Sequence, residues 1–263
     1  MVDSLPTKNG VDSSTFFQYA KRLRSLTLGT SNGHDDIPTL SLVRLADLQA
    51  PGNPFFPGLK SVAFTSSHVP QTTAIYGTLA LASPITSLEF TALEVETATF
   101  ATMLAFFSNR FSGSLTYLNL TFPVNNRDFT MESLRFLPRF QALRSLTLFS
   151  KNPRFPIFDK RLMDWILNLE SLENLKIDVC VVPTDLDTTT HHGKQAISAR
   201  LHTLRLGGPL NFIDFVLPMF AHRGVQITAL TLAPIGGYDP GPIRAFVQSN
   251  FPNALNSLEL LRN

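Results

Sequence analysis

The sequence predicts an α/β solenoid of about nine repeats, with a parallel sheet on its concave side and helices on its convex side. Two observations support this fold class: a short leucine pattern recurs along the chain, and the segments between its copies have helical periodicity. One such unit cannot bury its apolar side alone, so neighbouring units must stack around one continuous core. We therefore expect residues 1–263 to form a single domain, with a cap in 1–22 and repeats in 23–263.

The recurring pattern is L-x-x-L-x-L, and its nine copies start on average 29 residues apart. The chain has 39 Leu, of which 21 occupy the 27 pattern positions; uniform scatter would place about 4 there. The alternation at the end of each copy is typical of a strand with one buried face. The nine expected strand segments start at Leu23, Leu59, Ile85, Leu115, Leu143, Leu172, Leu201, Ile227 and Leu255.

The segments between these strands have apolar residues at spacings of three and four, which predicts helices. Phenylalanines such as Phe106 and Phe107 should fill the core between helix and strand. Asp239-Pro240 is a typical start signal for the last helix, an N-cap followed by proline in the first turn. The expected helices cover residues 37–49, 72–82, 97–110, 128–140, 159–169, 211–222 and 240–250.

The two ends of a solenoid need polar caps, because a terminal repeat otherwise exposes apolar surface and an unpaired strand. At the amino end we expect a helix over 13–22, whose Phe16, Phe17 and Tyr19 cover the first repeat. At the carboxyl end only Arg262 and Asn263 follow the ninth segment. We expect this uncapped edge to fray or to be covered by another chain, including through self-association.

The nine segments resemble leucine-rich repeats of the long, helix-bearing kind found in ribonuclease-inhibitor-like horseshoes. The degenerate, Phe-rich repeats are also similar to the repeat halves of fungal F-box-like proteins, which implies substrate recognition within a ubiquitin-ligase-type assembly. The family's Asn after the strand is matched at Asn32 and Asn152, whereas most repeats lack it. An F-box has no counterpart in the residues before Leu23. If the chain descends from such proteins, we expect that it has lost the adaptor-binding half or is a fragment.

The concave face should carry the third, fifth and seventh residues of each segment, because the pattern leucines point inward. Most of these residues are small and polar, but aromatic and cationic residues interrupt them in the middle of the array. An aromatic anchor beside two cations is typical of a protein-binding hot spot or an acidic-peptide docking site. Alternatively, Asp178 or an acid at the rim of the sheet neutralises Lys176, and the aromatic rings merely cover exposed strand backbone. The candidate partner-binding residues are Glu89, Tyr117, Asn119, Phe149, Lys176, Asp178 and Arg205.

Several other kinds of site are disfavoured. The net charge of +2 comes from dispersed residues, which argues against nucleic-acid binding. No apolar run approaches 18 residues and no signal peptide is recognisable, so we expect no membrane contact and a cytoplasmic or nuclear location. His191 and His192 lack further ligands at metal-binding spacing, and Cys180 has no partner for an intrachain disulfide. Without a phosphate loop or paired catalytic carboxylates, we expect no cofactor, no metal and no enzyme.

Three function classes remain. The first is a non-catalytic scaffold that binds a protein partner on the concave face. The second is a degenerate structural repeat domain without a specific ligand. The third is a GTPase-activating-type regulatory horseshoe, which requires an exposed arginine in a loop; Arg110, Arg127 and Arg154 are the candidates.

Overall fold

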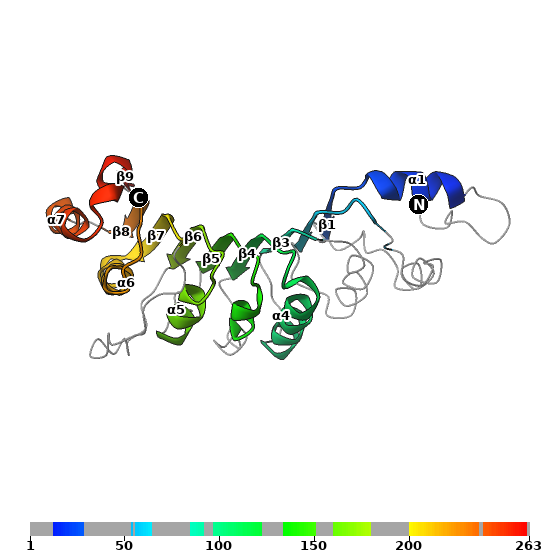
Figure 1. Cartoon of the computed structure of the whole chain (residues 1–263), viewed down its shortest axis with the longest axis horizontal. Coiled ribbons are helices and arrows are strands. Elements are labelled where there is room, and N and C mark those ends of the chain that lie inside the picture. Colours follow the sequence, from blue (N-terminus) through cyan, green and yellow to red (C-terminus); the bar gives the residue numbers. More distant parts are fainter. Residues whose placement is uncertain are drawn as a thin grey trace.

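The structure is a computed structural model, and it describes residues 13–28, 54, 56–64, 85–91, 97–122, 134–150, 160–179, 200–236 and 239–261. Its centre is one sheet of nine parallel strands in chain order. Helices α4, α5 and α6 lie on the same side of the row of strands, which bends away from that side at its carboxyl end (Figure 1). The chain is therefore a solenoid-like α/β protein with a sheet layer and a helix layer, and the expected parallel sheet is confirmed.

Each strand coincides with one of the leucine segments. Strands β1 to β8 begin at the third residue of their segment, and β9 begins one residue later. The strands are β1 (Ser25–Leu28), β2 (Ser61–Phe64), β3 (Ser87–Thr91), β4 (Tyr117–Phe122), β5 (Ser145–Ser150), β6 (Asn174–Val179), β7 (Thr203–Pro209), β8 (Ala229–Ile235) and β9 (Leu258–Leu260). The strand prediction is thus confirmed along the chain.

The register aligns equivalent residues of successive segments. Leu146 pairs with Leu175, which in turn pairs with Leu204. These three side chains are buried, whereas their neighbours along each strand are partly exposed, so the sheet has one apolar and one accessible face. The buried residues form one cluster that extends from Leu59 on the second segment to Ala254 near the ninth. Stacked segments therefore share a continuous core.

Just before most strands, one backbone carbonyl group accepts hydrogen bonds from two backbone amides of the following segment. The carbonyl of Arg24 accepts hydrogen bonds from the amides of Lys60 and Ser61, at 2.9 and 3.1 Å. The same two-donor arrangement recurs at every joint from β1–β2 to β7–β8, with acceptor carbonyls on Arg24, Lys60, Thr86, Thr116, Arg144, Glu173 and His202. It satisfies backbone groups at the strand entrance, where the chain turns into the sheet.

Within the described residues, the helices largely match the sequence prediction. Asp239 caps α7, because its Oδ1 accepts a hydrogen bond from the amide of Gly241 at 2.9 Å. The expected helices at 37–49 and 72–82 lie outside the described residues. The helices are α1 (Ser13–Arg22), α4 (Thr97–Phe111), α5 (Lys160–Leu167), α6 (Leu210–His222) and α7 (Pro240–Asn250), with shorter 3-10 helices η2 (Leu137–Arg139) and η3 (Pro252–Ser257).

The expected helix over 128–140 is wrong in its described part. Residues 134–140 contain the short 3-10 helix η2 rather than the end of an α-helix. The reason is Pro138, which lies in the first turn of η2. Inside a longer α-helix its ring would clash with the carbonyl of residue 134 and its nitrogen could not donate. The apolar spacing therefore continues across Pro138, but the helix cannot.

The burial predicted for Tyr19 and Phe106 is wrong, and the prediction for the carboxyl-terminal edge of the sheet stays untested. Tyr19 is 67% exposed, so it does not cover the first repeat, and the side chains of Phe16 and Phe17 lie outside the described residues. Phe107 is buried as expected, but its neighbour Phe106 is 48% exposed because it faces away from the core. Strand β9 pairs with β8 alone among the described strands, and whether another chain covers it stays a prediction.

No helix in the described ranges is long and apolar enough to cross a membrane.

Candidate functional site

The accessible face of the sheet carries a row of polar side chains from the fifth segment positions. Glu89 pairs with Asn119, Asn119 with Thr147, Thr147 with Lys176 and Lys176 with Arg205. All five are partly exposed. Because side chains on neighbouring parallel strands stand side by side, the row presents acid, amide, hydroxyl and cation in that order.

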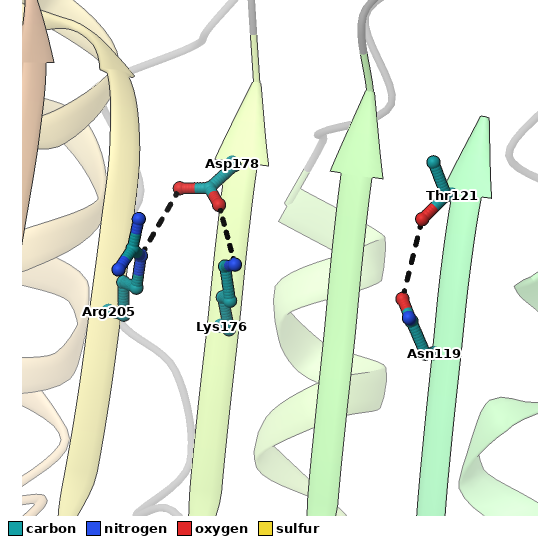
Figure 2. A network of polar contacts seen from close by, with 5 residues as sticks. All are labelled: Asn119, Thr121, Lys176, Asp178 and Arg205. Carbon is teal, nitrogen blue, oxygen red and sulfur yellow. Dashed lines mark hydrogen bonds and ion pairs between the residues drawn. The ribbon is translucent and has the colours of Figure 1, made fainter. Parts of the chain in front are cut away.

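The first part of the row is an acid and amide cluster on β3 and β4. Glu89 Oε1 accepts hydrogen bonds from Asn119 Nδ2 at 2.9 Å and from Thr91 Oγ1 at 3.2 Å. Thr121 Oγ1 donates to Asn119 Oδ1 at 3.4 Å (Figure 2). These contacts fix the orientation of the Asn119 amide, whose nitrogen faces the carboxylate and whose oxygen faces the hydroxyl.

Tyr117 lies beside this cluster, two residues before Asn119 on β4. Partial burial raises the pKa of its hydroxyl above 10.0, and the negative charge of Glu89 adds to the increase. A hydrogen bond with the Thr147 side chain acts in the opposite direction on this pKa. The phenol is thus placed between the carboxylate on β3 and the hydroxyl on β5.

This environment predicts a specific loss of stability in alkaline solution. The folded chain holds the Tyr117 proton more tightly than the unfolded chain, so the contribution is fully present below pH 10 and is lost as the pH rises through the folded-state pKa. Tyr117→Phe should therefore lose less stability than the wild type on going from pH 9 to pH 11.5. The measurement is the urea midpoint at both pH values, with Tyr19→Phe as the exposed control. Parallel losses in wild type and Tyr117→Phe would contradict the prediction.

The second part of the row is a charge cluster on β6 and β7. Lys176 Nζ lies 3.3 Å from Asp178 Oδ2, and Arg205 Nε lies 3.8 Å from Asp178 Oδ1 (Figure 2). The second distance is an ion-pair contact but too long for a hydrogen bond, and Nε is buried without a hydrogen-bond partner among the described residues. The expected contact between Asp178 and Lys176 is therefore confirmed. Asp178 also forms an ion pair with Arg205, so the cluster of three side chains keeps one net positive charge.

Gly207 makes room for the Asp178 carboxylate. The two residues are paired across β6 and β7, and a Cβ atom at position 207 would overlap Asp178 Oδ1. The carboxylate can reach both cations only because the neighbouring position on β7 has no side chain.

Gly207→Ala should consequently displace the Asp178 carboxylate and lower the free energy of unfolding by about 1 to 2 kcal/mol. The displaced atom is the end of a side chain, so the strain should largely vanish when that side chain is shortened. We expect Gly207→Ala to cost clearly less in an Asp178→Ala background, as measured by urea unfolding of the four chains. Equal costs in both backgrounds would refute the proposed overlap.

All seven candidate residues lie on the same face of the sheet. Glu89, Tyr117 and Asn119 form one group, and Lys176, Asp178 and Arg205 form the other. Phe149 on β5 lies between them, paired with Thr121 on one side and Asp178 on the other. Sequence period also places four further residues on this face, at fifth and seventh segment positions, but residue type alone did not mark them as the ones that organise the site: Thr91, Thr121, Thr147 and Gly207.

Of the other sequence candidates, the structure describes only Arg110. Arg110 lies in the last turn of α4 and not in a loop, so that expectation is wrong. Arg127, Arg154, Cys180, His191 and His192 lie outside the described residues. In the described ranges, no group of three or more His, Cys, Asp or Glu side chains could hold a metal ion. The arrangement on the sheet offers both charges, an amide and two aromatic rings, which suits non-covalent recognition.

Comparison with models of known protein families finds no match for this chain, and comparison with the curated proteins finds none either.

Proposed function

We propose that this protein is a leucine-rich-repeat horseshoe that acts as a scaffold and binds a protein partner on the accessible face of its sheet. The observation that carries the proposal is the row from Glu89 to Arg205, which places different polar groups side by side on neighbouring strands. Tyr117 and Phe149 add aromatic surface to a face that otherwise bears small polar and charged side chains. Aromatic residues and arginine are enriched where protein partners bind.

The finer proposal is that the chain corresponds to the substrate-recognition repeats of an F-box-like protein in a ubiquitin-ligase-type assembly. Its support is the resemblance of the degenerate, Phe-rich repeats to those of such proteins, together with the ordered stacking of the nine leucine segments. This role places the protein in the cytoplasm or the nucleus. It requires an adaptor-binding module in addition to the residues that form the sheet.

A structural repeat domain without a specific ligand is the second candidate. The observation in its favour is that Asp178 contacts both Lys176 and Arg205, so part of the charge on the face is already neutralised within the chain. The two candidates differ in one respect that can be measured, which is whether the exposed ends of these cations contribute to capture of another protein.

The test is a quantitative pull-down from native extract with purified, immobilised full-length chain. The site variant carries Lys176→Ala and Arg205→Ala, and the control carries Lys21→Ala and Arg244→Ala, which remove the same charges from exposed positions on α1 and α7. The scaffold proposal expects proteins that the wild type and the control capture at equal levels and that the site variant loses. If all three baits recover the same proteins, the structural candidate is favoured instead.

A further inference from the structure

We infer that the accessible face selects an extended peptide segment carrying one basic and one acidic side chain about four residues apart. The basic side chain would lie at Glu89 and the acidic one at Lys176 and Arg205. This inference rests on the proposed function, because it names the chemistry of the partner bound at the same face. It follows from the sign, accessibility and separation of the charges on the row.

The amino-terminal end of the row is an acceptor for a basic group. Glu89 carries the negative charge there, and its two hydrogen bonds, from Asn119 and Thr91, both fall on Oε1. In the described part of the chain no donor contacts Oε2, and the residue is partly exposed. A lysine or arginine side chain arriving from outside can therefore bond Oε2 without breaking the cluster.

The carboxyl-terminal end of the row has the opposite sign. Two cations share the single carboxylate of Asp178, whose own side chain is only 14% exposed. The side chains of Lys176 and Arg205 are 41% and 39% exposed, so their outer donors remain accessible. An incoming carboxylate would meet one uncompensated positive charge and the guanidinium group of Arg205.

The separation of the two ends sets the spacing of the peptide. Glu89 lies on β3 and Lys176 on β6, three strand steps apart in the continuous row. At about 4.8 Å per step this is roughly 14 Å, which an extended peptide spans in about four residues at about 3.3 Å each. Such a peptide runs across the strands, and its middle residues pass over Asn119 and Thr147, with Tyr117 and Phe149 on opposite sides of that line. An apolar or aromatic residue at its centre would lie between the two rings.

The mixed charge of the row also disfavours polyanions as binding partners. Glu89 and its hydrogen-bonded amide lie in the same row as the cations, so a nucleic acid or an anionic membrane lying along the whole row would bring phosphate against carboxylate. A partner with a single acidic patch fills only half of the face. The complementary occupant is a segment with both signs.

The test is fluorescence anisotropy of labelled synthetic peptides with the full-length chain. The matched probe is Gly-Lys-Ser-Phe-Ser-Asp-Gly, the spacing control is Gly-Lys-Asp-Ser-Phe-Ser-Gly with the same composition, and the third is the two-acid peptide Gly-Asp-Ser-Phe-Ser-Asp-Gly. We expect the wild type to bind the matched probe about fivefold more tightly than the spacing control, since exposed ion pairs each contribute up to about that factor. The difference should shrink at 1 M salt, where the screening length falls to about 3 Å.

Variants of Glu89 test the assignment of the two ends. Glu89→Gln retains an acceptor oxygen for Asn119 and Thr91 but no charge, so it should lose the preference for the matched probe. Glu89→Lys should shift the preference by a similar factor toward the two-acid peptide. The inference is overturned if the wild type does not distinguish the probes, binds none of them at millimolar concentration, or prefers the two-acid peptide. In each of those outcomes a pull-down that still depends on Lys176 and Arg205 would leave the scaffold proposal standing.

Discussion

Leu146→Ala is expected to lower the free energy of unfolding by about 3 to 4 kcal/mol. Leu146 is fully buried on β5, near the middle of the sheet, and its strand partners on β4 and β6 are Leu118 and Leu175. Packed segments on both sides prevent the cavity from collapsing. The measurement is equilibrium urea unfolding followed by circular dichroism.

The matched control is Leu258→Ala on β9. This strand lies at the edge of the sheet, and Leu258 is only partly buried, so the same chemical change should cost about 1 kcal/mol. A stacked solenoid requires this difference between its centre and its edge. Equal losses at the two positions would mean that Leu146 does not lie inside a continuous core.

Gly208→Ala is expected to cost about 3 kcal/mol. Gly208 lies within β7 at a φ of +148°, a backbone conformation that side-chain-bearing residues rarely adopt. A Cβ atom there would lie 2.7 Å from the carbonyl oxygen of Val179 on β6. Because that oxygen belongs to the backbone of a neighbouring strand, the strain can be relieved only by separating β6 from β7.

Two other glycines divide this cost into its parts. Gly224→Ala places a methyl group in open space but at a φ of +68°, so it reports the conformational strain alone and should cost about 1 kcal/mol. Gly113→Ala also meets nothing within 4 Å, and its backbone requires no positive φ, so it should change stability by less than about 1 kcal/mol. Urea unfolding of the three variants should therefore rank them Gly208, Gly224, Gly113. A Gly208→Ala variant as stable as Gly113→Ala would contradict the observed approach of β7 to Val179.

The sequence was sufficient to predict the strands and their alignment, because both follow from side-chain period. Alternation at Leu146 and Leu148 defines one buried face of the strand. Because the spacing after the first apolar residue is the same in every segment, equivalent residues of neighbouring strands are paired in the sheet. Helix α7 was also predictable to the residue, since Asp239 and Pro240 mark its start. These features depend on local residue type alone.

Features that depend on backbone geometry or on neighbouring segments were not predictable in the same way. The two-donor carbonyls before the strands involve backbone groups, which every residue type except proline has. At 134–140, the constraint of Pro138 outweighs a helical spacing of apolar residues. Tyr19 and Phe106 are aromatic residues of the kind that pack over a core, but the orientation of their helices exposes them.

In the candidate site, too, some features were predictable from the sequence and others were not. Strand period placed Lys176, Asp178 and Arg205 on one face, and a contact between the first two was an expected alternative. The bridge to Arg205 additionally requires that Gly207 leave space beside Asp178, a relation between two segments that are far apart in the sequence. Residue type identified the participants, whereas register determined which of them meet.

The central claim is that the nine segments lie side by side in chain order. Pulsed electron paramagnetic resonance tests it most directly, with one spin label at Ala63 on β2 and a second at Lys176, Thr231 or Glu259, after replacement of Cys180 by Ser. These second positions lie four, six and seven strands along the same row, so the distances should increase in that order. At about 4.8 Å per strand a straight row would give about 19, 29 and 34 Å, and the bend at the carboxyl end shortens the last two (Figure 1). A label on a later strand that lies closer to Ala63 than one on an earlier strand would contradict the stacked order.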